Sequence, residues 1–535
     1  METEKKKVVV VGAGMAGLTA AAYLAKNNYS VLLLDKNERT GGLLGTFEKN
    51  GFFFDSGPRA FINSGIIKPM LTDLGIKPIL LENKISIGIE NHLFRVDSID
   101  DLDTYEKILL DLFPGNDHDI TQITTAIRKL SDYTKVLYEF DNPNITPYLM
   151  KDKEYVFKKL LPWLLRFLVA NRKLNQYKMP MEEFMGRLTQ NRSIIDVITQ
   201  HFFKKTPSYF ALGYFYVYLD YFYPKGGTGA LSSLVTEKAL AAGAEIKLNK
   251  RVTRVVPAES RVVDIEGTSY PYDHLVWAAD LKTLYRSLDI EGMEPKRAQR
   301  IKSVEKRVLA SKGAESVFML CLGVNRPPSY FKEHGGEHFF YTPFRDGLTE
   351  VNLEEKQDLL KNFDRKSKEE VLAWLERFIN RNTYEVSVPA LRDPSLAPEG
   401  QTGLMISCLF DYEICKKVEQ AGWFDEFKDT VEKRMCSVFS QTVYKDLDND
   451  ILLKFSSSPL TISKLAGSSE GAITGWSFEQ VPPVVHSLSD IPKSVETPIP
   501  NVLQAGQWAY VPAGVPIAML TGWYAAQKIL KLDKK

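Results

Sequence analysis

The order of apolar and charged stretches predicts a strand–helix–strand unit near the start of the chain. Residues 8–25 carry no charge, and four valines from Val8 to Val11 are followed by small residues and an alanine-rich stretch to about Asn27. A second apolar run then ends on Asp35. The valine run is typical of a buried parallel strand, and the alanine-rich stretch favours a helix. We therefore expect a βαβ unit over Val8–Asp35.

Farther along the chain, the pattern predicts a mostly helical region over 96–224 with one aromatic strand inside it. Nine of the fifteen residues of Tyr209–Tyr223 are aromatic. Partial alternation at Tyr214, Tyr216 and Tyr218 indicates a strand with one aromatic face. Such a face either lines a channel for a long apolar chain or is ordinary core, and the pattern leaves both open.

Between Lys151 and Lys178, apolar and basic residues alternate in a way that suits a membrane surface. The apolar core is too short to span a bilayer, and Arg166 interrupts it. This composition fits a helix lying in the headgroup region of an anionic membrane, or equally a half-buried helix with a basic outer face. The residues concerned are Leu160, Leu161, Trp163, Leu164, Leu165, Phe167, Leu168 and Val169, flanked by Lys151, Lys153, Lys158, Lys159, Arg166, Arg172, Lys173 and Lys178.

Three glycines with the spacing G-x-G-x-x-G follow the first predicted strand. Gly12 permits a tight turn, Gly14 lets the backbone approach a pyrophosphate, and Gly17 allows the helix to pack closely on the strand. The helix N-terminus then points its free N–H groups at the phosphates. Asp35, 18 residues beyond Gly17, is placed to accept hydrogen bonds from an adenosine ribose. The unit therefore predicts an adenine-dinucleotide site.

The lysine-rich start of the chain gives the same segment a second interpretation. Met1–Lys7 contains three consecutive lysines before the uncharged run, which superficially resembles a signal peptide. The glycine spacing and Asp35 explain these residues better, because cleavage would discard the glycine motif. We expect a cytoplasmic protein.

Composition and charge exclude several classes of protein. The 535 residues suffice for at least two cores, and 68 basic against 67 acidic residues imply no nucleic-acid partner. Cys321, Cys408, Cys415 and Cys436 lack paired C-x-x-C spacing, so neither a disulfide framework nor a zinc ribbon is indicated. We expect all four to be reduced core residues.

Two later segments extend the glycine motif into the pattern of a known family. Arg39-Thr40-Gly41-Gly42 follows the second strand, and Gly51-Phe52-Phe53-Phe54-Asp55-Ser56-Gly57-Pro58 comes soon after. With these segments the chain resembles the FAD-dependent phytoene desaturase and carotenoid isomerase family, phytoene dehydrogenase-like NAD(P)/FAD-dependent oxidoreductases whose superfamily includes the monoamine oxidases. The resemblance continues through Pro224–Leu231, the strand His274–Trp277 and the segment Asn501–Pro516, so it covers essentially the whole chain.

The resemblance implies a discontinuous FAD site. The double glycine would run past the diphosphate, the backbone of Val252 would face the adenine, and the helix after Pro516 would begin at the flavin pyrimidine. The cofactor-binding residues implied in this way are Gly12, Gly14, Met15, Ala16, Gly17, Asp35, Lys36, Gly41, Gly42, Gly57, Pro58, Val252, Ala279, Gly506, Gln507, Gly514, Val515 and Pro516.

The chain departs from the family pattern at three positions. Leu43 follows the double glycine where Arg or Lys is usual, and Gln507 replaces an acid that contacts the ribityl chain. Arg59 follows Gly57-Pro58 where Thr is usual. A guanidinium there either binds a substrate carboxylate in bidentate fashion or is a structural arginine.

No other catalytic pattern emerges from the sequence. His334-Gly335-Gly336-Glu337-His338 matches the inverted zincin spacing, but two adjacent glycines disfavour the helix that a zinc site would need. We predict no metal site. Neither is a nucleophile elbow present. The catalytic residues stay unknown, with Asp55, Arg59 and the tyrosines Tyr214, Tyr216 and Tyr218 as candidates for contact with the substrate.

We therefore predict an α/β fold with a Rossmann-like, glutathione-reductase-like FAD-binding domain and an interleaved α+β substrate domain. The FAD-binding segments are 1–95, 225–285 and 456–535, and the substrate-domain segments are 96–224, which is also membrane-associated, and 286–455. Phe318–Val324 is an expected strand of the second domain, and Pro389–Gly400 an expected loop.

The expected activity is FAD-dependent desaturation, saturation or cis/trans isomerisation at the double bonds of a long apolar, carotenoid-like polyene. The protein would be cytoplasmic and peripheral to the membrane, from which its lipid substrate would come. Three alternatives remain open: a reductase or isomerase of unsaturated fatty acids that uses Arg59 for the carboxylate, an amine oxidase, and a non-enzymatic, flavin-stabilised lipid-binding protein.

Overall fold

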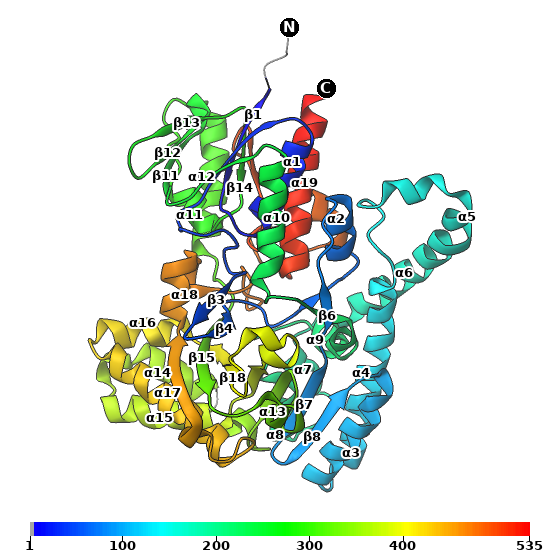
Figure 1. The fold of residues 1–535 in the computed structure, drawn as a ribbon, viewed down its shortest axis with the longest axis vertical. Coiled ribbons are helices and arrows are strands. Elements are labelled where there is room, and N and C mark those ends of the chain that lie inside the picture. Colours follow the sequence, from blue (N-terminus) through cyan, green and yellow to red (C-terminus); the bar gives the residue numbers. More distant parts are fainter. Residues whose placement is uncertain (1–4, 352, 535) are drawn as a thin grey trace.

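Two halves, each built around one large β-sheet, are stacked along the longest axis of the molecule (Figure 1). The computed structural model describes residues 5–351 and 353–534, so residues 1–4 of the stretch weighed as a signal peptide lie outside it. Both ends of the described chain lie in the half that contains the five-stranded sheet. Each half combines segments that are distant in the sequence.

The five-stranded sheet is parallel and contains the predicted βαβ unit. Its strand order is β10–β2–β1–β14–β20. The strands are β1 (Lys7–Val11), β2 (Ser30–Leu34), β10 (Glu245–Lys247), β14 (His274–Trp277) and β20 (Val502–Gln504), and the helix of the unit is α1 (Met15–Lys26).

The two faces of this sheet are buried against different layers. Successive side chains of a strand point to opposite faces, so the four valines of β1 divide between two cores. Val8 and Val10 pack with α1, α10 (Gly229–Ala241) and α19 (Val515–Asp533). Val9 and Val11 pack with a small antiparallel sheet of β11 (Val252–Val256), β12 (Arg261–Asp264) and β13 (Ser269–Pro271), and with α11 (Leu281–Arg286) and α12 (Pro295–Ala310).

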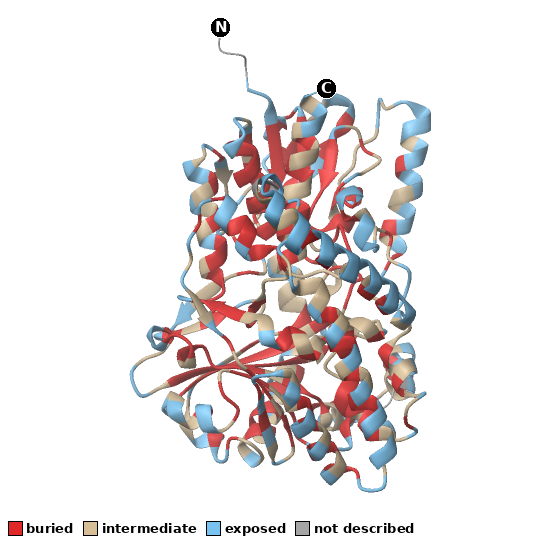
Figure 2. Ribbon diagram, turned by 90° about the vertical axis from the view of Figure 1, so that its right-hand side faces the viewer, coloured by how far each residue is buried: buried red, intermediate tan, exposed pale blue. Residues whose placement is uncertain are grey.

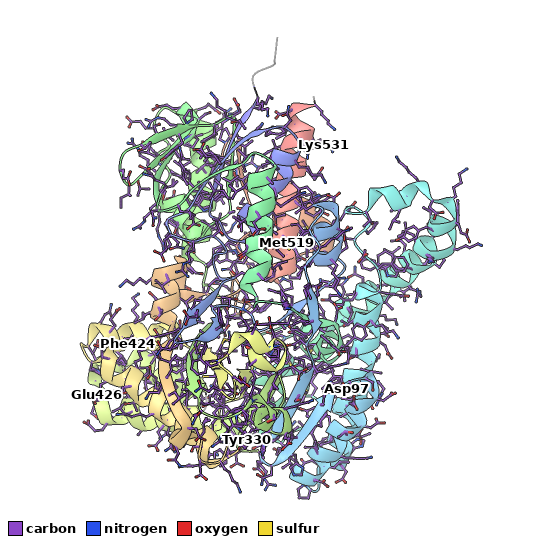
Figure 3. All side chains as sticks on the ribbon, in the orientation of Figure 1. Asp97, Tyr330, Phe424, Glu426, Met519 and Lys531 are labelled. Atoms are coloured by element: carbon purple, nitrogen blue, oxygen red, sulfur yellow. The ribbon has the colours of Figure 1, made fainter. Side chains whose placement is uncertain are left out.

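Helix α19 runs from the middle of the molecule to its outer end. Met519, near the inner end of α19, is fully buried, whereas Lys531, near the outer end, is exposed (Figure 3). A Cβ on Gly522 would lie 2.2 Å from the backbone oxygen of Ala16, so glycine permits the close contact between α19 and α1. The last helix of the chain is thereby fixed against the first.

The second sheet has seven strands in the order β19–β15–β18–β17–β16–β7–β8. These are β7 (Ile85–Ile89), β8 (His92–Val96), β15 (Ser316–Val324), β16 (His338–Thr342), β17 (Tyr384–Ser387), β18 (Thr402–Phe410) and β19 (Ile451–Ser457). One face packs on α13 (Pro328–Glu333), α14 (Leu353–Lys361), α15 (Lys368–Arg381), α16 (Tyr412–Gln420) and α17 (Phe424–Gln441).

The opposite face of this sheet, around β7 and β8, is covered by the helical region. The helices are α3 (Leu102–Leu112), α4 (Asp117–Tyr138), α7 (Met181–Met185), α8 (Arg192–Thr199) and α9 (Ser208–Val217). Because β7 and β8 already belong to the large sheet, the chain enters this half before residue 85 rather than at 96. Figure 2 shows that the strands of both sheets are largely buried.

Short elements join the two halves. They are β3 (Thr46–Lys49) with β4 (Phe52–Asp55), the three-stranded set β5 (Phe61–Ile62), β9 (Tyr221–Pro224) and β6 (Leu80–Glu82), and the helix α18 (Pro459–Ala466). The helix α2 (Ile67–Asp73) packs in the core of the first half. Phe52 and Phe54 of β4 pack on Met319, Cys321 and Met405 of the large sheet. Through these contacts β4, which follows the glycine motif in the sequence, packs against the second half.

The predicted aromatic strand over Tyr209–Tyr223 is wrong for most of its length. Residues 208–217 form α9, a 3₁₀ turn follows over 218–220, and only Tyr221–Pro224 is a strand. Because the segment is apolar all round, it is buried between α4 and the sheet, where tertiary packing determines the backbone. Its alternation was too partial to define a strand.

A helical arm extends away from the second half at the segment predicted to be membrane-associated (Figure 1). It consists of α5 (Lys153–Tyr155), a π-helical turn over Val156–Leu160, and α6 (Leu161–Leu174). Trp163 fastens the arm, because its indole N–H donates to the Val136 carbonyl over 2.8 Å and its ring stacks on Phe140. Across residues 5–351 and 353–534, none of the helices has the length and apolarity that crossing a membrane requires.

Candidate functional site

The glycine loop between β1 and α1 is shaped to admit an anionic group. A Cβ on Gly17 would lie 1.9 Å from the Gly12 carbonyl oxygen, and one on Gly12 would lie 2.8 Å from the Ala278 oxygen. A Cβ on Gly14, by contrast, would meet no atom within 4 Å. No side chain caps α1, so its first N–H groups face this open space.

Segments from two other parts of the chain meet at this loop. Gly41 donates its N–H to the Ala13 carbonyl over 2.7 Å, and a Cβ on Gly42 would lie 3.1 Å from Gly14 Cα. A Cβ on Gly506, after β20, would lie 3.4 Å from Ala16 Cβ. All of these segments lie at the carboxyl ends of parallel strands, where ligands bind in open α/β sheets. Gly12, Gly14, Gly17, Gly41, Gly42 and Gly506 are therefore brought together.

Asp35 holds the loop and still borders the site. Its carboxylate accepts the backbone N–H of Ala13 over 2.6 Å and that of Asn37 over 2.8 Å. Burial raises the pKa of this carboxyl group, against the effect of the two N–H donors. The side chain is only half-buried, which leaves lone pairs for a ribose.

The remaining residues expected at the cofactor occupy the rim of the same region. Ala279 follows β14 beside Gly12, and Val252 begins β11. Gly514 precedes the uncapped N-terminus of α19 at Val515-Pro516, a second set of free N–H groups. Lys36 is turned outward, since its ammonium group donates to the Lys464 carbonyl. Met15, Ala16 and Gly17 form the first turn of α1, and Gln507 follows Gly506.

These features fit a dinucleotide whose diphosphate lies against Gly14. The loop has open space beside Gly14, and two uncapped helix N-termini, of α1 and α19, border the region. A helix N-terminus attracts negative charge and supplies unused N–H donors. No basic side chain follows the double glycine, since Leu43 and Leu44 occupy those positions. The diphosphate would therefore be held by backbone N–H groups.

Asp55 and Arg59, two candidates for contact with substrate, have internal partners instead. The Asp55 carboxylate accepts from Thr46 Oγ1, the Thr228 N–H and the Tyr223 hydroxyl over 2.6–2.8 Å. Arg59 is 4% exposed, and its guanidinium donates to the backbone oxygens of Asp55 and Gly57 and to Ser407 Oγ. Both side chains join the halves, and a substrate carboxylate would have to displace the partners of Arg59.

Aromatic rings form a wall beside the central strands of the large sheet. Tyr214 and Tyr218, one helical turn apart, have ring centroids 5.4 Å apart, and the Tyr214 and Tyr221 hydroxyls are 2.6 Å apart. Tyr216 is half-buried and, two residues from both Tyr214 and Tyr218, lies on a different face of α9. We call the following set the aromatic wall: His201, Tyr214, Tyr218, Tyr221 and Phe340.

An apolar chamber lies on one side of the aromatic wall. Its cavity volume is only about 50 Å³, below the range typical of ligand pockets, so its side chains must move apart before an apolar chain enters. His201, Tyr218 and Phe340 contribute to both the wall and the chamber. Burial lowers the pKa of His201 to about 4, although Glu385 opposes the shift, so the imidazole is neutral at pH 7. The other lining residues are Ile87, Ile89, Tyr105, Ile127, Met181, Val197, Ile198, Phe202, Ala211, Leu212, Phe215, Thr342 and Thr383.

On the other side of the wall, Glu385 projects from β17, the fourth strand of the seven. Its neighbours across the sheet are Phe340 on β16 and Ser407 on β18. One carboxylate oxygen lies 2.9 Å from Nε2 of His338. The Glu385 side chain is nevertheless 34% exposed, because it borders the space in front of the wall. An acidic group thus faces an otherwise aromatic and apolar interior.

Residues 10–74 match the family model for NAD(P)-binding Rossmann-like domains. Over 558 aligned residues the chain is 21% identical to a 4,4'-diapophytoene desaturase (4,4'-diaponeurosporene-forming) of Staphylococcus aureus strain COL, covering 98% of this chain and 99% of the relative. The same enzyme of strain Newman matches equally. In sequence, the chain resembles the diapophytoene desaturases from end to end. The resemblance expected from the motifs is confirmed.

Solved structures with the same fold are oxidoreductases and a mutase. Putrescine oxidase bound to putrescine aligns with a TM-score of 0.59 at 14% identity, over 98% of this chain and 99% of the other. An oxidoreductase from Methanosarcina mazei gives 0.55 at 14% identity over 98% and 100%. Reduced UDP-galactopyranose mutase gives 0.52 at 15% identity over 99% and 96%. The predicted fold class, an α/β fold with a Rossmann-like dinucleotide-binding domain, is confirmed.

The H-x-x-E-H segment does not form a helix. His334 ends α13, the two glycines have φ of +134° and +77°, and His338 begins β16. Within the described residues, no three His, Cys, Asp or Glu side chains are grouped to hold a metal ion. His338 instead bonds Glu385. The four cysteines are buried and free, as expected.

Sequence reasoning missed the polar groups in front of the wall: Glu385, His338, Asn83 and Arg392. They come from separate loops and strands, and no spacing in the sequence relates them. The only signal was His338, which was noticed within a motif of the wrong kind.

Proposed function

We propose that this protein is an FAD-dependent oxidoreductase that acts on carbon–carbon double bonds of a long apolar polyene. The observation that carries the proposal is the apolar chamber behind the aromatic wall, in a chain that resembles diapophytoene desaturases over its whole length. Among desaturation, saturation and isomerisation, the names of these relatives favour desaturation.

Residues of the first half would hold FAD. The backbone around Gly14 and Gly42 takes the diphosphate, Asp35 the ribose, Val252 the adenine, and the α19 N-terminus the flavin ring. When bound, flavin supplies a two-electron acceptor for hydrogen removed from carbon. The remaining cofactor positions are those implied by the family resemblance, from Met15 and Ala16 through Gly57-Pro58 to Gln507.

The second half would bind the substrate. The chamber is lined by aliphatic and aromatic side chains apart from His201, Thr342 and Thr383, so it would bury one end of an apolar chain once these side chains move apart. Tyr214 and Tyr218 contact the chain where it passes the aromatic wall, whereas Tyr216 lies on the far side of α9. Arg59 gives little support to an acidic head group on the substrate, because both terminal nitrogens of its guanidinium already have partners and only its buried Nε–H has none.

The helical arm would dock on an anionic membrane and thereby place the enzyme at the cytoplasmic membrane surface. It exposes large apolar side chains that a water-soluble surface does not need. Basic residues alternate with them, as in helices that lie in the interface plane. The exposed apolar side chains are Phe157 (67%), Leu161 (40%), Leu164 (39%), Leu165 (68%), Leu168 (55%) and Val169 (59%).

The proposal is tested by purifying the full chain and recording its absorption spectrum. We expect a flavin spectrum, with FAD as the mass of the released cofactor. The protein is then mixed anaerobically with vesicles that contain an acyclic polyene, and the product is analysed by chromatography. We expect bleaching of the flavin together with a product that has one more double bond. Absence of flavin contradicts the cofactor assignment. Rapid bleaching by simple amines but not by polyenes would indicate an amine oxidase.

A further inference from the structure

The position of Glu385 is unusual for an acidic residue. Its strand neighbours Tyr384 and Val386 point into the core on the opposite face of the sheet, so Glu385 must point toward the aromatic wall. Ser407, the β18 residue opposite Glu385, accepts a hydrogen bond from Arg59 over 3.3 Å. Glu385 therefore lies close to the segment that follows Gly57-Pro58, between the expected cofactor region and the chamber.

A chain of hydrogen bonds orients Glu385 from behind. Arg392 donates through Nη1 to Oδ1 of Asn83 over 2.6 Å, which requires the amide nitrogen of Asn83 to be the atom near His338 Nδ1, at 3.2 Å. An amide nitrogen only donates, so Nδ1 of His338 accepts. The proton of the neutral imidazole is therefore on Nε2, which donates to Glu385.

The same series of hydrogen bonds helps to determine the charges of His338 and Glu385. Burial lowers the pKa of His338 and outweighs the pull of Glu385, so the imidazole stays neutral. Burial alone would raise the pKa of Glu385, but the hydrogen bond from His338 and the nearby Arg59 charge reverse the shift, and the pKa falls. At neutral pH, Glu385 is thus an anion with one oxygen bonded to His338 and the carboxylate open to the space before the wall.

We propose that Glu385 is the general base of the reaction, and that His338, Asn83 and Arg392 position it. The assignment rests on the proposed function. In a desaturation, one C–H bond breaks and its electron pair leaves as hydride to the oxidised flavin, which is reduced. The neighbouring C–H bond gives its proton to the Glu385 carboxylate, and its electron pair becomes the new π bond. Water then takes the proton from Glu385, and an electron acceptor added to the assay, such as a quinone, takes the two electrons from the flavin so that turnover continues.

Other groups near the wall are poorer bases. Burial raises the pKa of Tyr214 to about 12 and that of Tyr221 well above its ordinary value, so both keep their protons. His201 gains a proton only near pH 4. The Asp55 carboxylate already accepts hydrogen bonds from three donors. Glu385 is the acceptor that is both charged and open.

The test compares Glu385→Gln with Glu376→Gln, in which the altered carboxylate is exposed on α15 beyond the opposite face of the sheet. Both proteins should bind flavin with unchanged spectra. With a polyene in vesicles, Glu385→Gln should lose about 100-fold or more in kcat with little change in KM, as expected for loss of a general base. Glu376→Gln should retain wild-type kcat. A Glu385→Gln enzyme with more than half of wild-type kcat overturns the assignment.

The pH profile separates a base from a structural residue. Wild-type kcat should fall in acid as Glu385 is protonated, and Glu385→Asp should keep this acid limb at reduced kcat. If Glu385→Gln does not fold, the Asp variant decides: an unchanged kcat and a lost acid limb contradict the proposal. In His338→Phe the acid limb should move to higher pH, because the donor that holds the pKa of Glu385 down is gone.

A readout independent of turnover comes from infrared difference spectra of wild type minus Glu385→Gln, titrated without substrate. The Glu385 carboxylate band should persist at neutral pH and titrate at higher pH in His338→Phe. If the Glu385 carboxylate band titrates at the same pH in wild type and in His338→Phe, the positioning role of His338 is contradicted. If flavin-loaded wild type converts no polyene, the proposed function fails and the base assignment falls with it. If wild type converts polyene and the Glu385 variants do so equally well, only the base assignment fails.

Discussion

Gly14 and Gly17 belong to one motif but are required for different reasons. Gly17 is needed by the fold, because a side chain there would overlap the Gly12 carbonyl at 1.9 Å. Gly14 has φ of −74°, which any residue can adopt, and a Cβ there would face open space. The polypeptide itself therefore does not need glycine at position 14. Only a bound group that approaches the backbone would need it.

This difference predicts opposite results for two substitutions. Gly14→Val should leave the melting temperature of the flavin-free protein close to wild type and abolish flavin binding. Gly17→Ala should lower the melting temperature of the flavin-free protein as well, with an overpacking cost of about 1–3 kcal/mol or more. Differential scanning fluorimetry of stripped proteins and flavin titration measure both effects. A Gly14→Val protein that binds FAD like wild type would exclude the diphosphate from this position.

His201 makes stability depend on pH. Its folded-state pKa of about 4 lies below the ordinary value of 6.5. Between these values the unfolded chain binds a proton that the folded chain does not, so stability falls as the pH falls. Each unit of separation corresponds to about 1.4 kcal/mol.

We therefore expect wild type to lose about 2 kcal/mol more than His201→Gln between pH 7 and pH 5. Urea unfolding at both pH values gives the comparison. His118→Gln, at an exposed position on α4, serves as control and should follow wild type. Identical pH dependence in wild type and His201→Gln would mean that folding does not shift the pKa of His201.

Helix α9 shows why some elements could not be predicted from the sequence. Its mixture of aromatic and small residues has no polar face, so neither a helical nor a strand period stands out. The elements that carry a strong local signal were predicted well: β1–α1–β2 by its glycines and β15 by its apolar run. The expected loop over Pro389–Gly400 contains two 3₁₀ turns, over Pro389–Leu391 and Pro394–Leu396.

The helical arm yields a prediction about one element. Leu165→Asp combined with Leu168→Asp should weaken binding to anionic vesicles by at least about tenfold, since each buried leucine contributes about 1.5–3 kcal/mol. Flavin content should not change. Ile265→Asp with Val481→Asp, at exposed apolar positions elsewhere, is the matched control and should bind vesicles like wild type. Binding is measured by flotation with the vesicles. If the Leu165/Leu168 and Ile265/Val481 double variants float in equal amounts, the arm is not the docking surface.

The cofactor site and the group of residues around Glu385 differ in how the fold brings their residues together. Most cofactor segments follow a strand of one parallel sheet, so strand order alone brings the glycines together and a motif can report them, whereas Gly57-Pro58 follows β4 of the antiparallel pair. The groups around Glu385 meet only because β7, β16, β17 and β18 pair in one sheet and α9 packs across it. Such pairings between distant segments leave no spacing in the sequence, so Asn83, His338 and Arg392 could not be predicted.

The chamber depends on the same long-range assembly, and its size should set the length of substrate that fits. Ala211 lies on α9 and lines the chamber. Ala211→Phe would fill this small space and keep it from widening, without touching the cofactor segments. For a full-length polyene, kcat/KM should fall about tenfold or more, in line with the cost of misfit in an apolar pocket. For a polyene shortened at one end, the kcat/KM of Ala211→Phe should stay close to that of wild type, because the end of this substrate does not reach position 211. Product chromatography with both substrates gives the ratio. An equal loss for both lengths would mean that the chamber does not receive the end of the chain.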